Sequence, residues 1–238
     1  MGTDVLQRWI SDPYLSDRRI QSIVESVAAK PVAKYVVLDD FFRPETYERL
    51  RESCLRSAFT KKQIERFDSH YEKLEEVDLE LFSDPEWHRY CANLVGVKTP
   101  LLHKQSTNFH RHPVDSTGFW IHRDDVTDQR TIAVIGYFNH DWKSSNGGLL
   151  RVWREDEALA SNLKPIDVNR IRESPQLFQD KRVRCSFFGV GDRDYTLVDQ
   201  VVPEANRLFI CNLQGANFWH SVTPSRERER YSFIQWIA

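Results

Sequence analysis

The sequence has 238 residues, and its 33 lysines and arginines offset 35 aspartates and glutamates to give a formal net charge of −2. This length suits one large domain or two small ones, and the near-neutral charge gives no electrostatic reason to expect nucleic acid or an anionic membrane as a partner. Hydrophobic residues make up 40% of the chain and aromatic residues 12%, which excludes disorder as the main state.

No stretch approaches the ~18 consecutive apolar residues of a membrane span, and the first residues carry charges where a signal peptide needs an apolar run. We therefore expect a cytoplasmic protein. The cysteines lie far apart and form no CxxC pair of the kind found in zinc or redox sites. We expect them to be reduced and mostly buried: Cys54, Cys91, Cys185 and Cys211.

The first hundred residues are predicted to form a mainly helical support region. Apolar residues recur at helical spacing between Ser16 and Ala29, and the run 35–38 then predicts a short buried strand. A second amphipathic helix follows Pro44. Its predicted apolar face consists of Tyr47, Leu50, Cys54 and Leu55.

A third helix is predicted after Ser83, because the segment 83–86 matches a capping box. Gly96 is expected to end this helix. Its apolar face consists of Trp87, Tyr90, Cys91 and Leu94.

From residue 101 onward, β-branched and aromatic residues come in short runs separated by turn residues, which predicts a sandwich or barrel-like β core with helices against one face. The polar segment 155–182 interrupts the series and is interpreted as an insertion. The expected strands are 101–112, 117–123, 130–138, 148–154, 184–190, 195–202, 207–212, 216–222 and 230–237.

Two histidines and one carboxylate could together form a metal site. The strand-like segment 118–125 has a period of two, which places His122 and Asp124 on one face and Arg123 on the other. His220, just before a proline turn, is a candidate third ligand. Two His and one carboxylate form the facial triad of non-heme Fe(II) oxygenases.

Arg230 begins the last predicted strand, ten residues after His220. Its guanidinium could reach into the barrel and bind a carboxylate through two hydrogen bonds. The alternative is a solvated charge at the end of the charged run 226–230.

At this point the sequence resembles the 2-oxoglutarate and Fe(II)-dependent oxygenases, particularly the prolyl 4-hydroxylase-like branch that includes the hypoxia-sensing prolyl hydroxylases. The resemblance extends from about residue 108 to the last residue, outside the insertion, and the run 36–42 is similar to the family's entry strand. Its motifs are the His-x-Asp strand 117–124, the run 136–142, the Gly-Gly-x-Leu strand 146–152, and the segments 202–208, 220–224 and 230–231.

The resemblance implies a mainly β fold with flanking helices (α+β): a single domain over 1–238, with a double-stranded β-helix, or cupin-like jelly roll, over 101–238. It implies His122, Asp124 and His220 as iron ligands. Residues expected to contact 2-oxoglutarate are Arg230, Tyr137, Leu150 and His112, which stands where relatives often have a tyrosine. Trp236 and Arg123 are candidate substrate contacts. Tyr137 could instead be an ordinary core aromatic with a satisfied hydroxyl.

The implied reaction uses Fe(II), 2-oxoglutarate and O2, with ascorbate as a supporting reductant, and releases succinate and CO2 as a C–H bond is hydroxylated. The leading interpretation is hydroxylation of a prolyl or other residue in a protein or peptide, with no nucleic-acid or membrane partner. Two alternatives stay open. One is a hydroxylase of a free amino acid or small metabolite, and the other is a catalytically silent metal-binding β-helix domain. The insertion is a candidate lid or a neutral surface segment.

Overall fold

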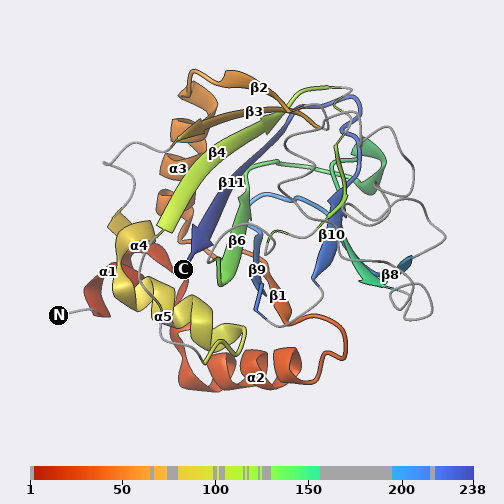
Figure 1. The fold of residues 1–238 in the computed structure, drawn as a ribbon. Coiled ribbons are helices and arrows are strands. Elements are labelled where there is room, and N and C mark those ends of the chain that lie inside the picture. The colour runs from red at the N-terminus through yellow and green to blue at the C-terminus, as the bar shows by residue number, and fades with distance from the viewer. Residues whose placement is uncertain are drawn as a thin grey trace.

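The computed structural model describes residues 3–64, 67–73, 80–98, 101, 105–114, 116, 118–122, 124, 130–155, 195–214 and 218–238. These residues form two antiparallel sheets with helices along one of them (Figure 1). This α+β arrangement confirms the predicted fold class and matches a double-stranded β-helix. Within the described ranges, no helix is long and apolar enough to cross a membrane.

The major sheet has seven strands in the order β1-β9-β6-β11-β4-β3-β2, and the minor sheet has four in the order β5-β10-β7-β8. The major-sheet strands are β1 (Tyr35–Leu38), β2 (Thr60–Ile64), β3 (Phe67–Lys73), β4 (Gln105–His112), β6 (Ile132–Tyr137), β9 (Leu208–Asn212) and β11 (Arg230–Ile237). The minor-sheet strands are β5 (Phe119–His122), β7 (Leu150–Glu155), β8 (Tyr195–Val201) and β10 (Trp219–Val222).

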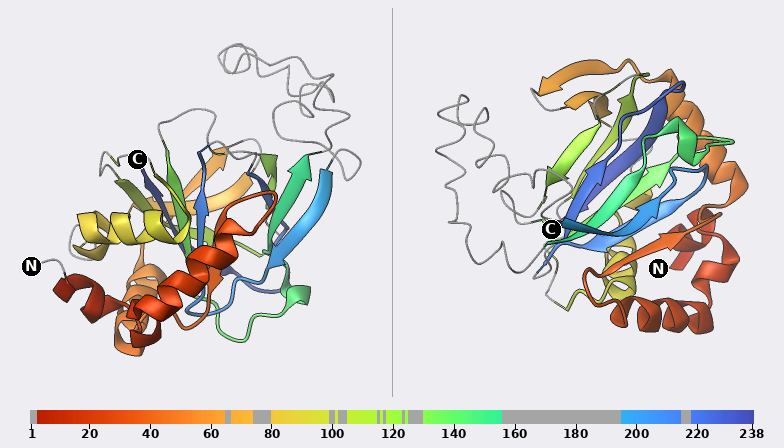
Figure 2. Two further views of the ribbon diagram at one scale, coloured as in Figure 1. Left: turned by 90° about the horizontal axis from the view of Figure 1, so that it is seen from below. Right: turned by 90° about the vertical axis from the view of Figure 1, so that its right-hand side faces the viewer.

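Apolar side chains from both sheets meet in a core between them, which includes Tyr35, Phe209, Val152 and Phe218. At one edge of this core, the hydroxyl of Tyr35 on β1 donates a hydrogen bond of 2.7 Å to Asp199 on β8. The two views of Figure 2 show the minor sheet beside the major one. Each sheet therefore has one face directed at the same interior.

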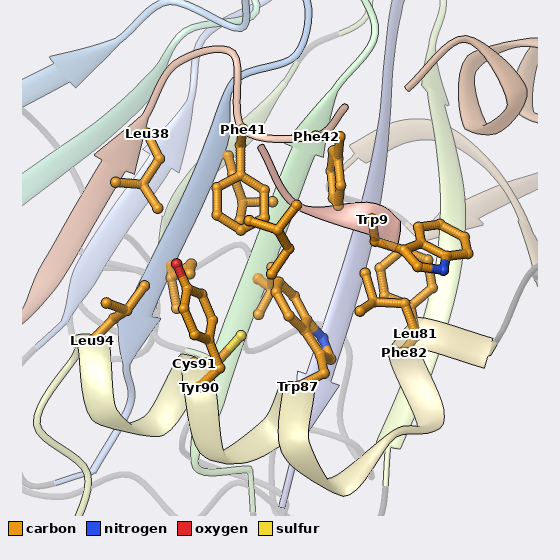
Figure 3. Close-up of a cluster of buried hydrophobic side chains, with 14 of the residues drawn as sticks. Trp9, Leu38, Phe41, Phe42, Leu81, Phe82, Trp87, Tyr90, Cys91 and Leu94 are labelled. Atoms are coloured by element: carbon orange, nitrogen blue, oxygen red, sulfur yellow. The ribbon is translucent and has the colours of Figure 1, made fainter. Parts of the chain in front are cut away.

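The helices cover the other face of the major sheet. They are α1 (Thr3–Trp9), α2 (Asp17–Ala28), α3 (Pro44–Arg56), α4 (Glu80–Ser83) and α5 (Pro85–Leu94), with the 3-10 turn η1 (Asp12–Leu15). A second 3-10 turn, η3 (Ser144–Asn146), lies in the connection between β6 and β7. Figure 3 shows side chains of α4 and α5 pointing toward the strands, among them Phe82, Trp87 and Cys91. The predicted helical region thus buttresses the sheet. Cys54, Cys91 and Cys211 are buried, as expected, and Cys185 lies outside the described residues.

Two local features differ from the sequence predictions, and a third agrees with them. Leu55, placed on the apolar face of the second helix, is 42% exposed, because the buried stripe follows Tyr47, Leu50 and Cys54. Asp84, rather than Ser83, caps α5, since its side chain accepts a hydrogen bond from the Glu86 amide. Gly96, which has a φ of +69°, follows α5 as expected.

The hairpin formed by β2 and β3 was not predicted, although it completes one edge of the major sheet. Its sequences, TKKQI and FDSHYEK, are polar and charged, as is common in edge strands that resist pairing with other chains. Such strands lack the apolar alternation on which the prediction relied. The predicted strand 184–190 and the insertion beyond Glu155 lie outside the described residues.

Gly136 on β6 lies opposite Phe233 on β11. A Cβ at this position would lie 2.0 Å from Cε1 of Phe233, a fully buried ring. We therefore expect Gly136→Ala to lower the free energy of unfolding by about 1 to 3 kcal/mol through overpacking, measured by chemical denaturation. In the double variant Gly136→Ala/Phe233→Leu, the loss of unfolding free energy should be smaller than the sum of the losses in the two single variants. Losses that simply add would contradict this explanation.

Candidate active site

Asp124 and His220 lie close together at the interior face of the minor sheet. Oδ2 of Asp124 is 3.8 Å from Nε2 of His220, and the two side chains are 20% and 8% exposed. The ring of His220 stacks on Phe218 with 4.9 Å between centroids. An imidazole nitrogen and a carboxylate oxygen at this separation can face one metal ion.

His122, the last residue of β5, pairs with His220 across the ladder between β5 and β10. The side chain of His122 lies outside what the structure describes, and so does all of Arg123. Asp124 comes after the end of β5, in a bend, so the predicted strand alternation does not extend as far as this carboxylate. The described residues thus bring together two of the three predicted iron ligands and the backbone of the third.

Among the described side chains, no three His, Cys, Asp or Glu residues form a group suited to a metal. Asp124 and His220 are among these side chains, whereas the imidazole of His122 is not. The three-ligand set therefore stays a prediction.

Arg230 is buried, with 1% of its surface exposed, at the start of β11. Its guanidinium carbon lies 5.1 Å from the centroid of the Tyr137 ring, and Nη1 lies 3.4 Å from the hydroxyl of Ser232. No carboxylate pairs with Arg230 within the described part of the chain. This burial contradicts the alternative that Arg230 is a solvated surface charge.

Tyr137 ends β6 and is as deeply buried as Arg230. Among the described residues, neither its hydroxyl nor Nε of Arg230 has a hydrogen-bond partner. Burial lowers the pKa of the Arg230 guanidinium and raises the pKa of the Tyr137 hydroxyl, while the proximity of the two groups opposes both changes. A buried cation beside an unsatisfied hydroxyl is suited to bind a carboxylate.

Gly148 permits this arrangement of Arg230. It adopts a φ of +63°, and a Cβ there would lie 2.7 Å from Cδ of Arg230 and 3.2 Å from the hydroxyl of Ser225. The backbone of Gly148 can therefore lie directly against the aliphatic part of the Arg230 side chain. Any larger residue at position 148 would displace Arg230. The Ser225 hydroxyl is also buried and without a described partner.

His112 and Leu150, the other predicted co-substrate contacts, lie in the same interior. His112 on β4 pairs with Arg230 on β11, and cross-strand partners project to the same face of a sheet. The fully buried ring of His112 meets Phe119 edge-on at 5.0 Å, which joins the two sheets. Leu150 on β7 belongs to the same buried cluster as Tyr137.

Trp236, predicted as a substrate contact, donates a hydrogen bond from Nε1 to Oδ2 of Asp124 at 3.3 Å. The Arg130 guanidinium lies 4.3 Å from the centroid of its ring. Sequence reasoning missed Arg130, which no motif distinguishes. It also missed Ser232, although the strand period of two from Arg230 could have indicated it.

Comparison with known proteins identifies the family. The model of the 2OG-Fe(II) oxygenase superfamily matches residues 107–238, more than half of the chain. The chain belongs to this superfamily. Its activity class is that of a 2OG-Fe(II) dioxygenase, for which the family implies Fe(II) and 2-oxoglutarate. No curated protein matches the sequence.

Solved structures of the superfamily share the fold of this oxygenase. A prolyl-4-hydroxylase from Pseudomonas putida is similar with a TM-score of 0.59 at 15% identity, covering 92% of this chain and 97% of that one. A Trichoplax adhaerens prolyl hydroxylase, solved with a hypoxia inducible factor peptide fragment, gives 0.61 at 14% identity, covering 92% and 89%. HygX from Streptomyces hygroscopicus, solved with nickel and 2-oxoglutarate, gives 0.50 at 12%, covering 93% and 87%.

The described residues of this oxygenase fit both groups that the family implies. Asp124 and His220 supply oxygen and nitrogen donors of the kind that Fe(II) accepts. The unsatisfied polar atoms of Arg230 and Tyr137 match an anionic co-substrate with a terminal carboxylate.

Proposed function

We propose that this oxygenase hydroxylates a C–H bond of a prolyl or other residue in a protein or peptide, releasing succinate and CO2. In this proposal His122, Asp124 and His220 hold Fe(II), while Arg230 and Tyr137 bind the distal carboxylate of 2-oxoglutarate. The observation that carries the proposal is the buried Arg230, which has no carboxylate partner among the described residues and lies beside the unsatisfied Tyr137 hydroxyl.

Bound Fe(II) supplies the activation of dioxygen and the oxidative decarboxylation of 2-oxoglutarate. The chain positions the reactants. Arg230 donates charge-assisted hydrogen bonds to the far carboxylate, and the Tyr137 hydroxyl donates another. Together these bonds fix the position and orientation of the bound co-substrate. Asp124 would contribute the one negative charge among the proposed ligands, so a bound Fe(II) would keep a net positive charge that favours an anionic co-substrate.

The interior around these groups is apolar, and this is expected to exclude water. Phe119 and Leu150 pack beside the Arg230 end of the site. A dry site strengthens the interaction between Arg230 and a carboxylate, and it protects reactive species from side reactions. His112, on the strand next to Arg230, is proposed as a further co-substrate contact.

The proposed substrate class is supported by the fold similarity to prolyl hydroxylases, one of which was solved with a peptide. The proposed retention of Asp124 as a ligand favours hydroxylation, because halogenating relatives replace that carboxylate. A free amino acid or small metabolite is the competing substrate class, and the assay below separates it from a peptide.

The test measures succinate formed from 2-oxoglutarate by purified protein with Fe(II) and ascorbate under air. We expect succinate from the wild type and only background from Asp124→Ala, with faster turnover when proline-containing peptides are added than with free proline. Equal succinate from both proteins would reject Asp124 as a ligand. Stimulation by free amino acids alone would reject the peptide substrate.

A further inference from the structure

The indole of Trp236 lies between Asp124 and Arg130. Its N–H donates to Oδ2 of Asp124, the same oxygen that lies 3.8 Å from Nε2 of His220. The Arg130 guanidinium lies over the indole ring, 4.3 Å from its centroid. The carboxylate oxygen nearest His220 is therefore held from one side by a group that is not itself a metal ligand.

The position of this indole is set by its strand. Trp236 lies on β11, which pairs with β4 and β6 on its two sides, opposite Ser106 and Ala133. The ring of His110, also on β4, approaches it edge-on at 6.5 Å. A donor on an interior strand of a seven-stranded sheet has little freedom to follow a moving carboxylate.

The stacked cation adds to this restraint. A guanidinium over an indole is attracted to the electron-rich face of the ring, which fixes the plane in which the N–H points. Polarisation by a neighbouring charge also strengthens a hydrogen bond within such a chain of contacts. The contacts therefore run from Arg130 through the Trp236 indole to the Asp124 carboxylate, which lies at the proposed metal site.

We propose that Trp236 is a positioning residue that orients the Asp124 carboxylate toward His220 and so preorganises the metal site before metal binds. This inference rests on the proposed function, because it assumes that Asp124 is a ligand. The indole N–H removes part of the rotational freedom of the carboxylate, so less of that freedom has to be lost when metal binds. Groups of this kind, one step removed from the metal, typically alter metal affinity roughly 10- to 100-fold.

The test measures Mn(II) affinity by electron paramagnetic resonance, without 2-oxoglutarate and without turnover. Trp236→Phe keeps a ring for Arg130 to stack on and removes only the N–H donor. The matched control is Trp153→Phe. The guanidinium of Arg151 lies over the Trp153 ring, 5.9 Å from its centroid. The N–H of Trp153 donates to the Ser221 hydroxyl at 2.8 Å and not to Asp124.

We expect Trp236→Phe to weaken Mn(II) binding by roughly tenfold or more, and Trp153→Phe to leave it within about twofold of the wild type. Thermal denaturation of both variants checks that a loss of affinity does not reflect a loss of folding. Trp236 is only partly buried, so the phenylalanine variant is expected to fold.

Two outcomes separate this inference from the proposed function. Wild-type affinity in Trp236→Phe, together with lost affinity in Asp124→Ala, would overturn the positioning role and leave the metal site standing. Unchanged affinity in Asp124→Ala would overturn the metal site itself. An equal loss in Trp236→Phe and Trp153→Phe would overturn the positioning role, because it would show a general effect of losing an indole.

Discussion

Replacing Arg230 with methionine is expected to raise the KM for 2-oxoglutarate by about 100-fold or more and to raise the Tm of the ligand-free protein. Losing one partner of a buried, hydrogen-bonded charge pair costs roughly 2 to 5 kcal/mol, and about 1.4 kcal/mol corresponds to a factor of ten. In the ligand-free protein, however, Arg230 is a buried cation with no carboxylate partner among the described residues. Replacing such a charge with an apolar side chain is often stabilising.

Arg207 provides the matched control for Arg230→Met. Its side chain is 16% exposed, and it pairs with Asp39 at 2.5 Å and Glu204 at 2.9 Å. Arg207→Met should therefore lower the Tm and leave the KM for 2-oxoglutarate unchanged. An unchanged KM in Arg230→Met would exclude its role as the carboxylate anchor, whereas a lower Tm would show that Arg230 stabilises the fold.

Replacing His220 with alanine should reduce succinate formation by at least roughly 100-fold, because a direct ligand is expected to matter more than the groups that orient it. The substitution removes an imidazole stacked on Phe218, so a destabilisation of about 1 kcal/mol, ordinary for a point substitution, is expected. Succinate yield and Tm are measured on the same preparation. The protein should stay folded at the assay temperature.

His140→Ala serves as the control for His220→Ala. His140 has a side chain that is 47% exposed, and it lies 3.7 Å from Glu48 on α3, away from the proposed ligands. Turnover in this variant should equal that of the wild type. Unfolding of His220→Ala would indicate that His220 stabilises the fold, and full activity would remove it from the ligand set.

Much of the fold could be predicted from the sequence, because its interior strands are apolar and short. The runs that became β6 and β9 are buried on both faces, so their hydrophobic residues are nearly continuous in the sequence. The hairpin of β2 and β3 was missed because its polar sequence carries no strand pattern, and its strand structure depends on pairing with the neighbouring β4. The exposure of Leu55 was missed for a related reason, since helical spacing alone does not define the edges of a buried stripe.

The site shows the same division. Arg230 stood out because it begins an apolar strand at a fixed distance from His220, and the structure buries it beside Tyr137. The contacts among Arg130, Trp236 and Asp124 join residues more than a hundred positions apart in the chain. Such contacts leave no local pattern, since they depend on how the last strand of one sheet meets a bend that follows a strand of the other.

The proposed site is divided between the two sheets. Arg230, Tyr137 and Trp236 come from the major sheet, whereas His220 comes from the minor sheet and Asp124 from the bend after its strand β5. A co-substrate held by Arg230 at one end and by the metal at the other would act as a removable cross-link between the sheets. Its binding energy would then also resist their separation, so the mechanical integrity of the β core would depend on how much co-substrate is present.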